Sequence, residues 1–350
     1  KNTSPKFDMG RNFCNKLWNA TRFALGILSA SPAGSLDPLL PWSLTPLVPP
    51  SLPPNNHPMT PPSDPAAIIE RKRADIARQM AEITFAELEA LVAQQEPPRN
   101  FFAAVTDHPD PFHVSVIAEI ERKGIDGRWH RPAYEAAFDT ASIARAFYAN
   151  GAAAISVNTD TPFSAGQLSM IEQVKAASPL PVLRRDFIID PWQLWESRAA
   201  GADAVVLLAE FLTLAEIVDL HILAQRLGLT VLLEVNSIEH LLRVRPHVGF
   251  PHKSYSLLAI SNRAPGAAEP DLSHTLRMVE MVEDTPTLVS DSGIHVYEDL
   301  LRFRKHNVRI ALEGRSLMRA DDPGRALAAL LRRAYRKPDN PPTPPRGVRP

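Results

Sequence analysis

Charged side chains follow a short apolar run at residues 181–190, which read Pro-Val-Leu-Arg-Arg-Asp-Phe-Ile-Ile-Asp. Apolar residues directly after a proline are typical of a short, buried parallel strand. Arg184, Arg185 and Asp186 come at the carboxyl end of that strand, where α/β folds place their chemistry. The pattern therefore predicts a catalytic or binding site at this point.

Carboxylates end two other apolar runs. Glu119 and Glu121 alternate with apolar residues, and the two-residue repeat of an extended chain puts them on one face together with Lys123. Glu234 directly follows three apolar residues of a third run. A carboxylate in such a setting is costly unless it is paired or protonated, and this is how a general acid or base is usually tuned. We expect catalytic roles here, with a structural ion pair as the alternative for Glu234.

Two further turns carry glycine next to hydroxyl groups, at residues 290–294 (Ser-Asp-Ser-Gly-Ile) and 312–318 (Leu-Glu-Gly-Arg-Ser-Leu-Met). Glycine lets the backbone approach a ligand, and free N–H groups at the start of a short helix bind phosphate. Two such turns after the last two strands of a barrel are typical of a phosphate monoester site. The candidate phosphate-binding residues are Ser292, Gly293, Gly314, Arg315 and Ser316.

The elements that must position these residues alternate between strand-like and helix-like runs over residues 111–336. Eight such units predict a (β/α)8 TIM barrel. A doubly wound open sheet is the alternative, but the first strand is followed by no G-x-G-x-x-G turn. The expected strands are Val114–Glu121, Ala153–Val157, Pro181–Arg185, Ala204–Leu208, Thr230–Val235, Ser256–Ser261, Thr287–Ser290 and Val308–Leu312. The expected helices are Ser142–Asn150, Gln167–Ala177, Trp192–Ala200, Leu214–Arg226, Ile238–Val244, Leu272–Val282, Tyr297–Lys305 and Ala326–Tyr335.

The two ends of the chain differ in composition from the barrel. Residues 1–63 contain many prolines, which remove backbone donors and block helix, so we expect a disordered extension that is either a targeting peptide or translated upstream sequence. Residues 64–110 have helical spacing over 66–77 and 85–93, and we expect them to form helices that cover the barrel. Residues 337–350 are a second proline-rich tail.

Composition limits the possible partners. The net charge of −1 gives no basic surplus for nucleic acid, and no apolar run is long enough to span a membrane, so we expect a small-molecule partner. Cys14 is the only cysteine, which excludes an internal disulfide framework and fits a reducing compartment. The histidines form no H-E-x-x-H motif, and we predict no metal and no organic cofactor. The oligomeric state is open.

Residues 181–190 resemble the third-strand motif P-V-L-R-K-D-F-I-I-D of indole-3-glycerol phosphate synthases, the (β/α)8-barrel lyases of tryptophan synthesis. The resemblance runs from Ala66 to Leu331 and includes the family motifs G-I-N-N-R, near Arg263, and E-S-G-I and G-x-S-L-M in the two glycine turns. It implies a cytoplasmic barrel of the ribulose-phosphate-binding type, organellar only if residues 1–58 are a targeting peptide. The implied reaction closes the indole ring of 1-(2-carboxyphenylamino)-1-deoxyribulose 5-phosphate with loss of carbon dioxide and water, and needs no cofactor.

The resemblance also implies residue roles. Glu234 corresponds to the acid/base glutamate, and Glu119 orients it. Arg185 and Arg263 bind anionic parts of the substrate. The implied substrate-binding residues are Phe187, Ser261 and Arg263.

Two family lysines are replaced in this chain, one by Glu121 and the other by Arg185. Arginine stays charged and is a poor proton donor. Either Lys123 supplies the missing ammonium, or Glu121 pairs with Arg185. The alternative function is a paralogue that binds a phosphosugar without closing the indole ring. Gly124-Ile125-Asp126 stands where the family has the phosphate-binding S-P-S, and Asp291 replaces a glutamate.

Overall fold

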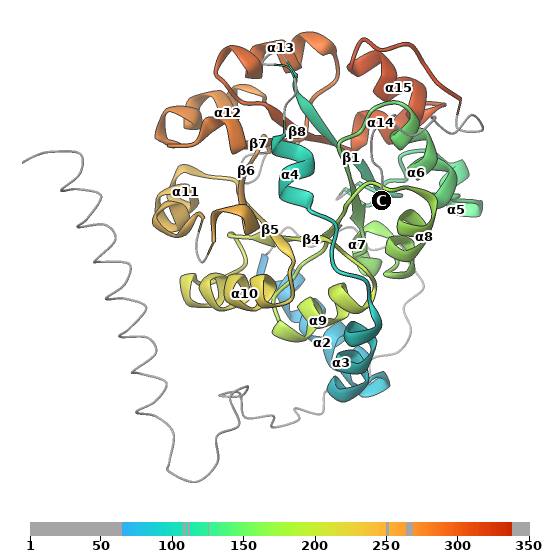
Figure 1. Ribbon diagram of the computed structural model, residues 1–350, viewed down its shortest axis with the longest axis vertical. Helices are drawn as coiled ribbons and strands as arrows, with labels where there is room; N and C mark the ends of the chain where they lie inside the picture. The colour runs from blue at the N-terminus through green and yellow to red at the C-terminus, as the bar shows by residue number, and fades with distance from the viewer. Residues whose placement is uncertain are drawn as a thin grey trace, which may run out of the picture. The chain divides into compact units, whose positions relative to one another are not determined.

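Eight parallel strands form a closed barrel in which each strand pairs with its neighbours in sequence, and β1 also pairs with β8 (Figure 1). The computed structural model describes residues 65–107, 110, 113–124, 126–249, 252–263 and 269–337. The predicted (β/α)8 barrel is confirmed. The strands are β1 Ser115–Ile120, β2 Ala154–Asn158, β3 Val182–Arg185, β4 Ala204–Leu208, β5 Thr230–Val235, β6 Ser256–Ser261, β7 Val289–Asp291 and β8 Ile310–Glu313.

Helices follow the strands and surround the barrel (Figure 1). Those of the repeating units are α6 Thr140–Ala149, α8 Ser169–Ala177, α9 Pro191–Ala199, α10 Leu214–Arg226, α11 Ile238–Val244, α12 Ser273–Met278, α13 Tyr297–Lys305 and α15 Pro323–Leu330. Short helices precede α6, α8 and α15, and these are α5 Ala133–Ala136, α7 Thr161–Ser164 and α14 Arg315–Arg319. The predicted extension 1–63, the tail from 338 and Cys14 lie outside the described residues.

Several predicted bounds differ from the observed ones, α12 and β8 included, and at two elements the local reason is clear. Helix α15 ends at Leu330 rather than at Tyr335, because Arg332 takes a left-handed conformation (φ 49°) and the N–H of Arg333 donates to Ala328 O, which closes the helix. Strand β7 begins at Val289 because Thr285–Thr287 form a 3₁₀ turn instead of extended chain.

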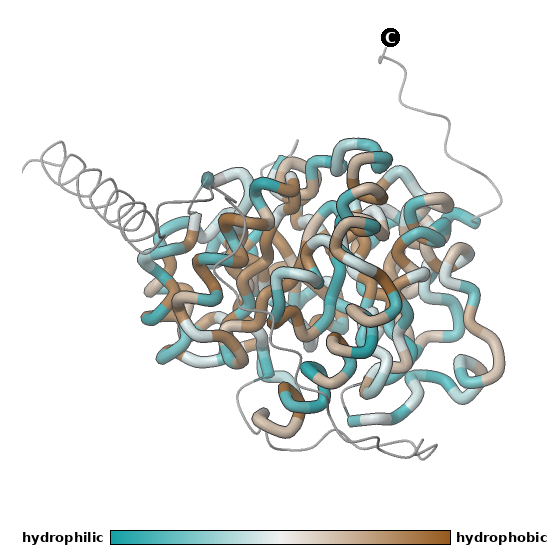
Figure 2. Tube along the Cα trace, turned by 90° about the horizontal axis from the view of Figure 1, so that it is seen from below, coloured by the Kyte–Doolittle hydropathy of each residue, from teal (hydrophilic) through white to brown (hydrophobic). Residues whose placement is uncertain are grey.

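Apolar side chains fill the barrel and the layer between strands and helices. Along each strand, residues alternate between these two cores. Ile117, Leu183 and Leu232 point inward, whereas Ala118, Val182 and Leu233 pack under the helices. In Figure 2 the apolar stretches accordingly lie inside, and hydrophilic residues lie mostly toward the outside. This alternation determines which residues at the strand ends face the barrel mouth.

The helices before the barrel lie at both of its ends. Helices α2 Pro65–Glu82 and α3 Phe85–Gln94 match the expected ones, but α4 Phe101–Thr106 was not predicted. Its fully buried Phe101 and Val105 pack into the inner core, and α4 contacts the 3₁₀ turn ahead of β6. Helix α4 therefore closes the amino-terminal end, at the centre of the ring in Figure 1.

Candidate active site

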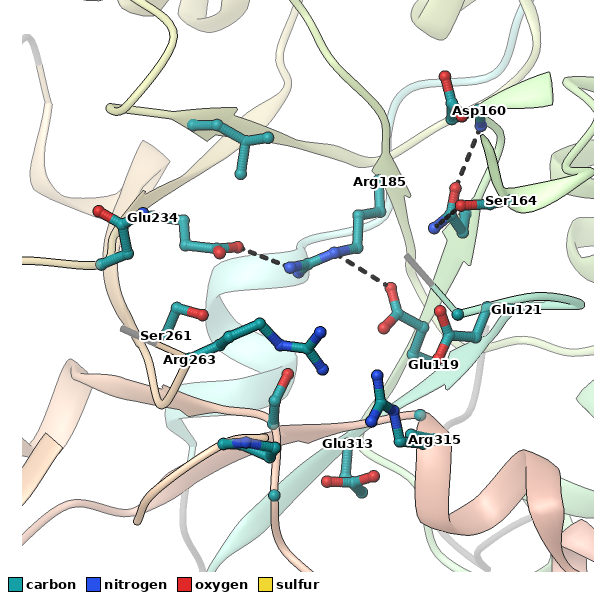
Figure 3. A pocket seen from close by; sticks show the side chains of 18 of the residues that line it. Glu119, Glu121, Asp160, Ser164, Arg185, Glu234, Ser261, Arg263, Glu313 and Arg315 are labelled. Atoms are coloured by element: carbon teal, nitrogen blue, oxygen red, sulfur yellow. Dashed lines mark hydrogen bonds and ion pairs between the residues drawn. The ribbon is translucent and has the colours of Figure 1, made fainter. Parts of the chain in front are cut away.

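The carboxyl ends of all eight strands surround a cavity of about 640 Å³ (Figure 3). Twelve of the thirteen predicted site residues line it, and Lys123 does not. The twelve are Glu119, Glu121, Arg185, Phe187, Glu234, Ser261, Arg263, Ser292, Gly293, Gly314, Arg315 and Ser316. The structure thus brings together residues that lie far apart in the chain, at the place where a TIM barrel carries its chemistry.

Arg185 lies in the middle of this cavity, between carboxylates from three other strands. Its Nη2 is 2.9 Å from Glu234 Oε2, and its Nη1 is 3.0 Å from Asp291 Oδ2. Its Nε is 3.5 Å from Glu119 Oε1. Each of the four residues comes two positions after an inward-pointing apolar residue, and the two-residue period of a strand therefore directs all four side chains inward.

One guanidinium cannot neutralise three buried carboxylates, and this imbalance determines where protons stay. Burial raises the pKa of Glu234 to about 8; Arg185 opposes this effect, and Asp291 adds to it by charge and as a hydrogen-bond partner. Burial likewise raises the pKa of Glu119 well above its ordinary value, against the attraction of Arg185. Burial alone would lower the pKa of Arg185, but the carboxylates outweigh it and raise this pKa. Glu234 is therefore a proton donor near neutral pH, and Arg185 is a permanent cation.

The two glycine turns meet at one end of the cavity. Ser292 and Gly293 both have positive φ angles, and a Cβ on Gly314 would lie 2.9 Å from the Cβ of Glu119, so glycine is needed there. Glu313, which the sequence patterns did not single out, is buried and accepts the N–H groups of Ile294 and Ser316, both at 2.8 Å. Its carboxylate joins the two turns and caps α14. Its position directly before Gly314 was the signal that could have identified it.

Two arginines face this same end of the cavity. Arg263 follows β6 and makes no ion pair or hydrogen bond with another described residue. Burial lowers the pKa of Arg263, and the charge of Arg315 lowers it further. The chemistry that this end can perform is recognition of an anion by guanidinium groups next to exposed backbone.

A family model described as indole-3-glycerol phosphate synthase matches residues 66–330. The chain belongs to the indole-3-glycerol phosphate synthase family. The match confirms the predicted family and nearly reproduces its predicted extent.

Curated relatives named indole-3-glycerol phosphate synthase agree with this assignment. The proteins of Albidiferax ferrireducens and Polynucleobacter necessarius are 36% identical over 264 residues and 34% identical over 272 residues. The protein of Rhodospirillum rubrum is 34% identical over 264 residues. Each alignment covers 75% of this chain and 96–97% of the relative. The shared region therefore contains nearly the whole of each synthase.

Both predictions about the missing family lysine of strand 1 are wrong. Strand β1 ends at Ile120, and the chain then folds back so that Lys123 pairs with Trp129. Lys123 Nζ lies 4.1 Å from the centre of the Trp129 ring, away from the face that carries Glu119. Glu121 does not pair with Arg185; its Oε1 is 2.7 Å from Nε2 of the buried His130. Lys123 lies beyond the end of β1, on the first arm of a hairpin that turns after it, so the alternation of the strand does not extend to Lys123.

A buried ion network, which the sequence patterns did not predict, joins α2 to this site. Lys72 Nζ is 2.5 Å from Asp186 Oδ1 and 3.5 Å from Asp160 Oδ1. Both carboxylates line the cavity. Asp186 also pairs with Arg184, whose Nη2 is 2.9 Å from its Oδ2. Burial and the charge of Asp186 raise the pKa of Asp160 to about 6, although Lys72 opposes the shift.

Replacement of Lys72 by methionine is expected to lower the free energy of unfolding at pH 7 by about 3 kcal/mol, because it leaves two buried carboxylates with less compensation. The loss should shrink below pH 6, where Asp160 takes up a proton. Urea denaturation measures both effects. Arg73→Met, which removes a charge from the exposed face of the same helix, is the control. A change below 1 kcal/mol in Lys72→Met would contradict the assigned role of the network.

No helix in the described part of the chain is both long and apolar enough to span a membrane. Among these residues, no group of three His, Cys, Asp or Glu side chains is placed to hold a metal ion.

Proposed function

We propose that this chain is an indole-3-glycerol phosphate synthase. It would act on 1-(2-carboxyphenylamino)-1-deoxyribulose 5-phosphate and close the indole ring with loss of carbon dioxide and water. The observation that carries the proposal is the convergence of Glu234, Arg263 and the two glycine turns on one cavity in a member of this family. The substrate is a small phosphosugar, and we place the reaction in the cytoplasm.

The substrate has a phosphate at one end and an aromatic carboxylate at the other, and the cavity offers groups for both. Ser292, Gly293, Gly314, Arg315 and Ser316 would hold the phosphate. Phe187 lies edge-on to Phe163 and Phe211, with ring centres 6.0 Å and 5.3 Å away. All three rings line the cavity and would form the wall for the substrate's aromatic ring. Ser261 and Arg263 also line the cavity.

Ring closure needs a proton on the carbonyl oxygen as the aromatic carbon attacks the carbonyl carbon. In this chain Glu234 would donate that proton, because it holds one near neutral pH. Arg185 would polarise the carbonyl and stabilise the charge that develops on oxygen. Loss of carbon dioxide restores the aromatic ring. Glu234 and Glu119 would then serve as the acid/base pair that expels the new hydroxyl group as water.

Direct assay of product formation tests the proposal. The purified chain should convert the substrate to indole-3-glycerol phosphate, and its gene should restore growth of a tryptophan auxotroph that lacks the synthase. Glu234→Gln is the negative control in both assays. If the chain binds the substrate but forms no product and restores no growth, it is a phosphosugar-binding paralogue instead.

A further inference from the structure

The guanidinium groups of Arg263 and Arg315 point toward each other at the phosphate end of the cavity (Figure 3). Two like charges repel when they are brought together away from water, and an anion between them removes that cost. Among the described residues Arg315 has one ion-pair partner, Glu269, whose Oε2 is 3.2 Å from its Nη1. The Arg315 side chain is 13% exposed, whereas that of Glu269 is 76% exposed. The ion pair thus joins a cation inside the cavity to a solvated carboxylate.

Arg315 lies over the turn that follows β1. A Cβ on Gly124 would lie 3.6 Å from Arg315 Nη2, in ordinary contact with the guanidinium. On the same wall Glu121, held by His130, brings a negative charge where the family has a lysine. Among the described residues, the arginines that line this end come from beyond β6 and β8.

We infer that the side chains of Arg315 and Arg263 together bind the substrate's phosphate, and that Glu269 forms its ion pair with Arg315 only while no phosphate is bound. This inference rests on the proposed function and deepens it. A guanidinium can donate hydrogen bonds to two phosphate oxygens at once. These charge-assisted hydrogen bonds are stronger than the ones that uncharged backbone N–H groups of a turn donate. An exposed carboxylate is a weak competitor, because water and salt screen its charge. Phosphate would displace it.

Titration calorimetry with inorganic phosphate, on the full chain at low ionic strength, tests this inference without any turnover. Arg315→Gln should weaken phosphate binding at least 10-fold, and Arg315→Lys should weaken it less, because lysine keeps the charge but not the fork of donors. Arg302→Gln, which removes one charge from the exposed face of α13, should leave the affinity unchanged. Thermal unfolding of each variant establishes that it is folded.

Glu269→Gln is the second variant to be titrated with phosphate. It should tighten phosphate binding about 2- to 5-fold, because it removes the competing carboxylate of an exposed pair. In the Arg315→Gln background it should have no effect. The inference is overturned if wild type shows no saturable phosphate binding, if Arg315→Gln stays within twofold of wild type, or if Glu269→Gln tightens binding equally in both backgrounds. Wild type that binds phosphate as expected but forms no indole product would refute the proposed function and leave this inference standing.

Discussion

Replacement of Arg185 by methionine is expected to lower kcat about 10²- to 10³-fold, because Arg185 is the only cation among the described residues that contacts Glu119, Glu234 and Asp291. It should also lower the free energy of unfolding at pH 7 by about 3 kcal/mol, since three buried carboxylates lose their counter-charge. The stability loss should be larger at alkaline pH, where unpaired carboxylates are forced to ionise. Steady-state assays of product formation and urea denaturation measure the two effects.

Arg185→Lys is the matched control, because it restores the family motif at residues 181–190 and keeps the positive charge. We expect it to retain activity within about 10-fold of wild type or to exceed it, since lysine can also donate a proton. If Arg185→Met keeps more than a tenth of the wild-type activity, Arg185 does not stabilise the transition state as proposed. Equal losses in both variants would mean that the planar guanidinium matters more than its charge.

The second large effect concerns the proton on Glu234. Because its pKa is raised to about 8, kcat/KM should be highest below pH 8 and fall as pH rises through that value. Glu234→Gln keeps the shape of the side chain but cannot transfer a proton, and it should lower kcat about 10²- to 10⁴-fold. Its residual activity should lack the alkaline decline. Burial is the main cause of the raised pKa; of the charged groups that face Glu234, Asp291 adds to the rise and Arg185 opposes it.

The same proton links stability to pH. The folded pKa of Glu234 lies above its ordinary value of 4.5, so the folded state binds the proton more tightly than the unfolded chain. Its stabilising contribution is complete below pH 4.5 and is lost as pH rises to about 8. Glu234→Gln should lack this part of the slope in the free energy of unfolding. Glu210→Gln, at the same cavity, is the control. If the free energy of unfolding of Glu234→Gln still falls with rising pH as it does in wild type, the proton belongs to another group.

The sequence was sufficient to predict the inward-facing residues of the strands. A strand has a two-residue period, and parallel strands bring their carboxyl ends to one edge, so Glu119, Arg185 and Glu234 could be placed at one mouth before any partner was known. The two glycine turns after the last strands were predictable on the same basis. Family motifs then connected these positions to one reaction.

Only the tertiary structure decided which charges meet. Lys72 and Asp186 are 114 positions apart, and barrel closure with the docking of α2 brings them into contact. The hairpin that follows β1 pairs Lys123 with Trp129, away from the face of Glu119, and gives Glu121 a histidine partner. Helix α4 could not be predicted for a similar reason. A six-residue helix is too short to be stable by itself, so packing against the barrel core stabilises it and its own periodicity does not. Local patterns determine where a side chain points, but its partner and its protonation depend on the packing of distant segments.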